Sequence, residues 1–155
     1  MTDDKSLIRD FLNGNTKSFD KLIHTHENWV KNMVYNIVKH QEDAEDIAQD
    51  VFVKVYFALK HFRFESKFKT WLYRIIINRG NNHFRKQKLL SCFGQELKEE
   101  MTSDLQADHL QIDKLYTLIH RLPTTQRNII MLRVYQDLPF KSISQILSIS
   151  ENSAK

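Results

Sequence analysis

The sequence of 155 residues contains few of the residues that break helices or cross-link chains: three glycines, two prolines and one cysteine. The scarcity of glycine and proline leaves the apolar periodicity almost uninterrupted, which favours helices. A single cysteine, Cys92, excludes an internal disulfide and any multi-cysteine zinc site. There is no stretch of eighteen consecutive apolar residues, and the first residues lack the pattern of a signal peptide. We therefore expect a cytoplasmic, all-α protein without a membrane insertion of its own.

The net charge of +4 is modest, but the charged residues are unevenly distributed. Residues 60–88 contain nine Lys or Arg and a single acid, Glu65. Residues 42–59 contain five acids and a single base, Lys54. An acidic block therefore lies directly before a basic block, and both lie in the first part of the chain.

Apolar residues spaced three and four apart predict the helices. The clearest stripe, residues 44–59, predicts a helix with one buried face and one acidic face. Residues 60–68 break this period with closely spaced aromatic and basic residues, which indicates a loop. Thr70 is the predicted N-cap of the next helix, which should run to about Lys86.

Weak periodicity and mixed polarity in residues 89–107 indicate a linker. The linker separates two small helical domains, which we predict at residues 1–88 and 108–155. In the second domain, Pro123 should end a helix because the residue before proline avoids helical geometry.

The end of the sequence has the outline of a helix-turn-helix. Residues 140–147 predict a helix of barely two turns, and Ser150 is a strong cap for a second helix that begins near Glu151. An ordinary pair of antiparallel helices has the same outline. The sequence ends at Lys155, after about one turn, whereas a reading helix needs about three turns. Either this is a piece of a longer chain with a truncated recognition helix, or this half does not read DNA as it stands.

Three segments in a fixed order resemble parts of one protein family. The segment EDAEDIAQDVFVKVY is similar to region two point two of that family, and FKTWLYRIIINRGNNHFRK is similar to regions two point three and two point four. The segment LPTTQRNIIMLRVYQDLPFKSISQILSISENSAK resembles the start and middle of region four. Each pattern alone is loose, but the three together, with the linker between them, are specific. The chain resembles the alternative bacterial sigma factors of the extracytoplasmic-function (ECF) group of the sigma-70 family.

The resemblance implies a promoter-specificity subunit that binds core RNA polymerase and promoter DNA and uses no cofactor, metal or catalytic residue. It also implies an anti-sigma factor that covers the polymerase-binding faces. In such proteins the acidic helix docks on the coiled coil of the clamp in the polymerase's largest subunit. The matching residues are Asp46, Gln49 and Asp50. An exposed acidic face beside an apolar stripe suits a basic partner helix.

The resemblance also implies that the basic loop and helix open the minus-ten promoter element and hold it as a single strand. Positive charge follows the phosphates, while aromatic and amide side chains receive unstacked bases. The matching residues are Phe64, Ser66, Lys69, Trp71, Arg74, Asn78, Asn82, Arg85 and Lys86. Leu72 stands where housekeeping sigma factors carry a second tryptophan. We therefore expect Trp71 to be a core residue or a partial base platform rather than a melting wedge.

In region four the resemblance places three residues at the start of the reading helix: Ser150, Ser153 and Lys155. Backbone amides and a lysine there can hold phosphates of the minus-thirty-five element. The family's region four also touches the polymerase flap. Ser148 occupies a turn position where glycine is usual, and specific reading of the minus-thirty-five element requires a longer helix than the sequence supplies.

Two other classes of function fit the sequence less well. A stand-alone helix-turn-helix regulator accounts for residues 140–155, but it needs neither an acidic docking helix nor a basic block in another domain. Binding to core polymerase without DNA separates it from a sigma factor. An enzyme is disfavoured because the seven histidines are scattered and none lies in a metal or nucleophile motif.

Overall fold

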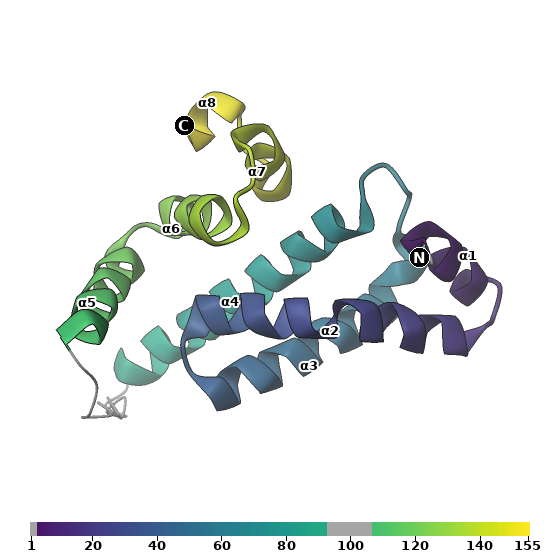
Figure 1. Ribbon diagram of the computed structural model, residues 1–155, viewed down its shortest axis with the longest axis horizontal. Helices are drawn as coiled ribbons and strands as arrows, with labels where there is room; N and C mark the ends of the chain where they lie inside the picture. The colour runs from purple at the N-terminus through teal and green to yellow at the C-terminus, as the bar shows by residue number, and fades with distance from the viewer. Residues whose placement is uncertain (1–2, 93–106) are drawn as a thin grey trace. The chain divides into compact units, whose positions relative to one another are not determined.

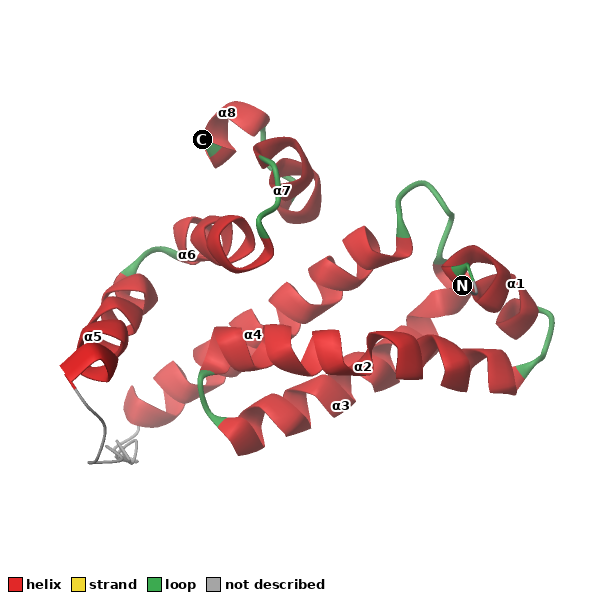
Figure 2. Cartoon of the chain, viewed as in Figure 1, coloured by secondary structure: helices red, strands yellow, loops and turns green. Residues whose placement is uncertain are grey.

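The computed structural model describes residues 3–92 and 107–155, and these residues form helices and short connections without a strand (Figure 2). The predicted all-α class is confirmed. Backbone contacts divide the chain into two compact units, Met1–Gly80 and Asn81–Lys155.

The first unit consists of α1 (Asp4–Leu12), α2 (Thr16–Val38), α3 (Gln41–Ala58), the short 3-10 helix η1 (Leu59–His61) and most of α4 (Phe68–Cys92). In Figure 1, α2, α3 and α4 run side by side, and α1 lies at one end of α2. The interior is built from the apolar stripes of these helices. Its fully buried side chains are Ile8, Leu22, Val30, Val34, Ala48, Val51, Val55, Leu59, Leu72 and Ile76.

The start and the end of α4 differ from the prediction. The helix begins at Phe68, so the predicted cap, Thr70, lies inside its first turn. The helix ends at Cys92, beyond the predicted Lys86, so the first four residues of the predicted linker are helical. The remainder of that linker, residues 93–106, lies outside the described residues.

Tertiary packing explains the early start of α4. Phe68 is only 4% exposed, and its ring packs against His26 of α2 and against Trp71, with centroids 5.3 and 5.7 Å away. The amide of Trp71 donates a hydrogen bond of 3.2 Å to the carbonyl of Lys67, which closes the first turn. Burial of Phe68 therefore decides where the helix begins, and local capping preference does not.

The second unit contains the last part of α4, then α5 (Ala107–Arg121), α6 (Thr124–Ile130), the π-helical turn η2 (Met131–Tyr135), α7 (Phe140–Leu147) and α8 (Glu151–Ala154). The helices α7 and α8 form the predicted helix-turn-helix. Ser148 adopts a left-handed backbone with φ of 56° and ends α7. The hydroxyl of Ser150 accepts a hydrogen bond of 3.1 Å from the amide of Ser153, which confirms the predicted cap.

Gly80 allows α4 to approach α2 closely. A β-carbon at this position would lie 2.8 Å from Cγ2 of Ile37, which is a steric clash. Glycine inside a helix costs about 1 kcal/mol relative to alanine, because it loses more backbone entropy on folding. The close approach of the two helices offsets that cost.

We expect Gly80→Ala to have opposite effects in two backgrounds. In the wild-type chain it should lower the free energy of unfolding by about 1 kcal/mol, because the clash with Ile37 outweighs the better helix propensity. In an Ile37→Ala background the clashing methyl group is gone, so the same change should raise stability by about 0.5–1 kcal/mol. Urea denaturation of the four proteins measures both effects. The same sign in both backgrounds would contradict the close approach.

Candidate nucleic-acid interface

A cluster of aromatic rings supports the loop between η1 and α4. Phe62 is 7% exposed, and its ring centroid lies 5.2 Å from that of Trp71, 6.1 Å from that of Phe68 and 4.9 Å from that of Phe64. Tilted and edge-on contacts of this kind are favourable for aromatic pairs. Phe64 and Trp71 remain partly exposed. The loop and the first turn of α4 therefore present two partly exposed rings, Phe64 and Trp71, which both pack against the buried ring of Phe62.

Phe64 holds a backbone conformation that a bulky residue rarely adopts. Its φ is 59°, in the left-handed region, which costs an L-residue about 1–2 kcal/mol. Such strain persists only where the surroundings fix it, and it gathers at functional sites. The surroundings here are the Phe62 ring and the guanidinium of Arg9, whose central carbon lies 5.6 Å from the centroid of the Phe64 ring. Sequence reasoning missed Arg9, because no local pattern connects it with the loop.

Lys69 and Trp29 form a second contact at the start of α4. The ammonium group of Lys69 lies 4.5 Å from the centroid of the Trp29 ring, within the range of a cation–π interaction. Trp29 in turn packs edge-on against Tyr73, with centroids 4.8 Å apart. Burial raises the pKa of Tyr73 to about 12, so this phenol remains neutral at physiological pH. Trp29 was also missed, although its position four residues before buried Met33 on α2 was a usable signal.

The remaining minus-ten candidates lie along α4 and in the loop before it. Arg74, Asn78 and Asn82 follow one another at four-residue spacing, which places them on successive turns of one side of the helix. Asn78 and Asn82 are exposed. The side-chain oxygen of Asn82 accepts a hydrogen bond from the guanidinium of Arg85. The other two candidates are exposed Lys86 and partly buried Ser66, and the hydroxyl of Ser66 donates a 3.4 Å hydrogen bond to the next carbonyl.

The predicted docking residues form an exposed acidic face on α3. Asp46, Gln49 and Asp50 are all exposed, while Ile47 and Val51 of the same turns are buried. Within the described part of the chain, no ion pair involves Asp46 or Asp50. Both carboxylates are therefore available to a basic partner.

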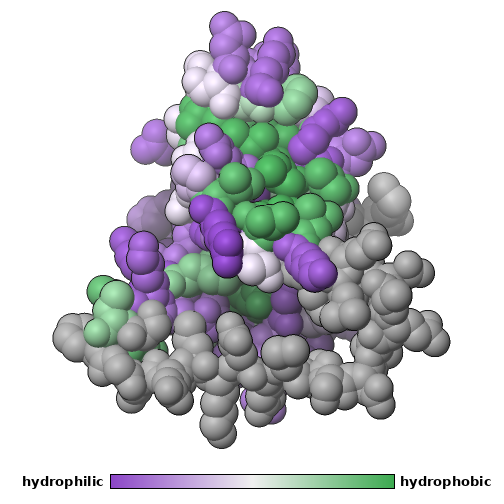
Figure 3. Space-filling view, turned by 90° about the vertical axis from the view of Figure 1, so that its left-hand side faces the viewer, coloured by the Kyte–Doolittle hydropathy of each residue, from purple (hydrophilic) through white to green (hydrophobic). Residues whose placement is uncertain are grey.

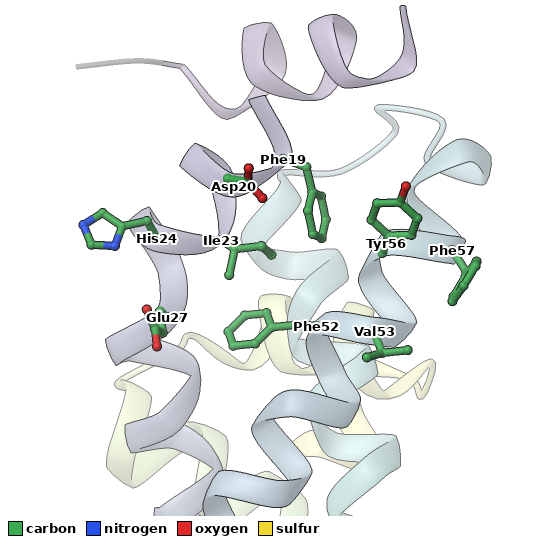
Figure 4. A pocket seen from close by; sticks show the side chains of 9 residues that line it. All are labelled: Phe19, Asp20, Ile23, His24, Glu27, Phe52, Val53, Tyr56 and Phe57. Carbon is green, nitrogen blue, oxygen red and sulfur yellow. The ribbon is translucent and has the colours of Figure 1, made fainter. Parts of the chain in front are cut away.

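An apolar groove follows the acidic face along α3. The groove has a volume of about 500 Å³ and lies between α2 and α3 (Figure 4). Its lining residues are Phe19, Asp20, Ile23, His24, Glu27, Phe52, Val53, Tyr56 and Phe57. Val53 is 58% exposed and Phe57 is 62% exposed. The groove therefore leaves apolar side chains exposed beside the acidic face of α3.

The three candidates in the second unit contact one another or their own helix. The hydroxyl oxygens of Ser150 and Ser153 are 2.7 Å apart, and the ammonium of Lys155 lies 3.4 Å from the carboxylate of Glu151. These contacts cap and stabilise α8.

Figure 3 shows apolar side chains gathered in one patch among hydrophilic ones. Leu115, Leu118 and Val134 are large apolar residues of this unit that are exposed.

None of the helices within the described ranges is long and apolar enough to span a bilayer. Two family models match the chain. The model of Sigma-70 region 2 matches residues 22–89, and the model of Sigma-70, region 4 matches residues 112–155. The chain is 27% identical over 158 residues to the ECF RNA polymerase sigma-E factor of Haemophilus influenzae, and the match covers 93% of this chain and 83% of that protein.

Solved structures of other proteins also resemble the chain. The structure of CnrH in complex with the cytosolic domain of CnrY matches with a TM-score of 0.70 and 21% identity, and it covers 97% of this chain and 86% of that one. This match supports the fold alone. An engineered region 2 of sigmaE in complex with GTAAAA matches with a TM-score of 0.53 and 33% identity, and it covers 56% of this chain and 90% of that one.

The left-handed backbone at Phe64 predicts an unusual order of stability between two variants. Both Phe64→Ala and Phe64→Gly remove the ring, but only glycine adopts a positive φ without cost. We therefore expect Phe64→Gly to be more stable than Phe64→Ala by about 1 kcal/mol in urea denaturation. Glu65 in the same loop is not in the left-handed region and supplies the control. At position 65 the glycine variant should be no more stable than the alanine variant. If glycine were favoured over alanine to the same extent at positions 64 and 65, backbone strain at Phe64 would be contradicted.

Proposed function

Because this chain belongs to the ECF group of the sigma-70 family, and is thus an alternative sigma factor that directs promoter-specific transcription initiation, we propose how its surfaces divide that task. Residues 1–88 form region two, which docks on the polymerase and recognises and melts the minus-ten element. Residues 89–107, of which the first four extend α4, connect region two to region four, which residues 108–155 form. The observation that carries the proposal is the strained aromatic loop at the start of a basic, asparagine-bearing helix.

The minus-ten strand binds along the loop and α4. The partly exposed rings of Phe64 and Trp71 offer stacking surfaces for unstacked bases. The basic side chains of this segment follow the phosphates, and the hydrogen bond from Arg85 orients the amide of Asn82 before DNA arrives. Support comes from the complex of sigmaE region 2 with GTAAAA, whose protein is 33% identical to this chain over the matched part.

Core RNA polymerase docks on the acidic face of α3. Asp46, Gln49 and Asp50 meet the clamp coiled coil of the largest subunit, where basic side chains neutralise the two carboxylates that have no ion-pair partner among the described residues. Region four adds contacts to the polymerase flap. The exposed apolar residues of the second unit suit such a protein contact.

An anti-sigma factor holds the protein inactive by covering the same faces. The apolar groove between α2 and α3 begins two residues after Asp50, so one helix could cover both the groove and the acidic face. The structure of CnrH, which has the same fold, contains the cytosolic domain of CnrY. The protein acts in the cytoplasm.

The region-four residues Ser150, Ser153 and Lys155 contact phosphates of the minus-thirty-five element where the second helix is complete. A stand-alone helix-turn-helix regulator is the weaker alternative, because it leaves α3 and the loop of Phe64 without a role. We also propose that the chain has no catalytic activity of its own, since members of its family are initiation factors rather than enzymes.

Charge reversal on α3 tests the docking surface. We expect Asp46→Lys with Asp50→Lys to weaken binding to purified core polymerase by about tenfold or more, because two favourable charge contacts become repulsive. Fluorescence anisotropy of the labelled chain, measured without DNA, gives the dissociation constant. The matched control reverses Asp3 and Asp10, two acids exposed elsewhere on the same unit. Equal affinity of the α3 variant and the wild type would refute this docking site.

Removal of two amides tests the minus-ten surface. We expect Asn78→Ala with Asn82→Ala to reduce open-complex formation by about tenfold, because two base or backbone hydrogen bonds are lost, and to leave core binding unchanged. Permanganate reactivity of the promoter bubble measures opening, on a promoter selected from a randomised library by wild-type holoenzyme. Asn28→Ala with Asn32→Ala is the control, since these asparagines are exposed at the same spacing on α2. Unchanged bubble reactivity in the α4 variant would remove these residues from the interface.

A further inference from the structure

The helix α1 lies before the residues that match Sigma-70 region 2, yet it contacts the loop that carries Phe64. The central carbon of the Arg9 guanidinium is 5.6 Å from the centroid of the Phe64 ring, within the roughly 6 Å limit of a cation–π interaction. The neighbouring side chains Leu7 and Ile8 are buried, at 4% and 0% exposure. Arg9 therefore projects from a helix that is anchored in the core.

Both ends of α1 are fixed to the rest of the unit. Near its start, Oδ1 of Asp4 lies 3.0 Å from Nε2 of His26, and the ring of His26 packs against Phe68 beneath the loop. Near its end, the ring of Phe11 contacts Phe19 and Tyr56, with centroids 5.2 and 5.3 Å away. A helix held at both ends gives Arg9 a defined position relative to the loop.

The loop depends on such support because Phe64 has an unfavourable backbone conformation. With φ at 59°, the conformation persists only if contacts to the side chain outweigh the backbone strain. Phe62 of the same loop and Arg9 both contact the ring of Phe64. If loss of the Arg9 contact increases the fraction of molecules with other loop conformations, the apparent affinity for a ligand of this conformation falls in proportion to the population that remains.

We propose that Arg9 is a positioning residue for recognition of the minus-ten strand. Its guanidinium holds Phe64 in the left-handed conformation, in which the partly exposed ring receives an unstacked base. This inference rests on the proposed function, in which the loop binds the melted strand. It extends the recognition surface to a helix outside the matched region.

The experiment is a double-mutant cycle in holoenzyme assembled from core polymerase and the full chain. The variants are Arg9→Ala, Phe64→Ala and their combination, with Arg9→Lys as the conservative change. Lys5→Ala is the control, because it removes one exposed positive charge from the same helix. The probe is a fluorescein-labelled single strand, selected from a randomised pool by wild-type holoenzyme. Its dissociation constant is measured over a series of salt concentrations, at a temperature where circular dichroism shows every variant folded.

We expect Arg9→Ala to weaken binding by roughly fivefold, as for loss of one cation–π contact that sets the loop population. The double variant should bind as Phe64→Ala does, because Arg9 acts only through that ring. Arg9→Lys should retain most of the affinity, and Lys5→Ala should bind as the wild type does. The dependence of affinity on salt should be the same for Arg9→Ala and the wild type.

Four results would overturn the inference. If Arg9→Ala bound the strand with wild-type affinity, Arg9 would have no role in recognition. If the loss of affinity in the double variant equalled the product of the two single losses, Arg9 would act independently of Phe64. A salt slope lower by about one in Arg9→Ala would show a direct phosphate contact instead. Wild-type affinity in Phe64→Ala would overturn both this inference and the role proposed for the loop, whereas a loss in Phe64→Ala alone would leave that role intact.

Discussion

The packing of Phe62 and Phe68 beneath the loop is the interaction on which the candidate site depends. Phe62 is buried where η1 ends, and Phe68 is the buried first residue of α4. Their contact fixes both ends of the loop. It also fixes the rotation of α4 about its own axis. Core packing therefore determines the direction in which the face with Arg74 and Asn78 points. Precise presentation of polar side chains thus follows from apolar burial.

The helices themselves were predictable, because their evidence is local. The stripe of α3 and the cap at Ser150 follow from spacing and residue type within a few positions. The start of α4, the role of Arg9 and the contact between Lys69 and Trp29 were not predictable, since each depends on a ring or charge from a distant part of the sequence. The spacing of Trp29 from Met33 indicates only its place on α2. His26 buries Phe68, Arg9 covers Phe64 and Trp29 receives Lys69. Such pairs leave no periodic signal.

Not all charges of the acidic and basic blocks neutralise one another in the structure of the first unit. Asp46 and Asp50 form no ion pair with any other residue that the structure describes, and Lys69 is held by an aromatic ring instead of a carboxylate. Exposed charges without an ion-pair partner contribute little to the free energy of folding, but they still attract partners of opposite charge. On the proposed assignment, both polymerase docking and strand capture therefore weaken as salt is raised.

The position of the apolar groove explains how one partner could silence this surface without deforming it. The groove is lined by Phe52 and Val53, which directly follow Asp50 on α3. A partner that buries these exposed apolar side chains gains affinity from desolvation, while polymerase docking, on the proposed assignment, relies on the adjacent carboxylates. On that assignment, a partner that also covers Asp50 excludes polymerase from the same surface. Inhibition then follows from relative affinity and concentration alone, and no second conformation of the domain is required.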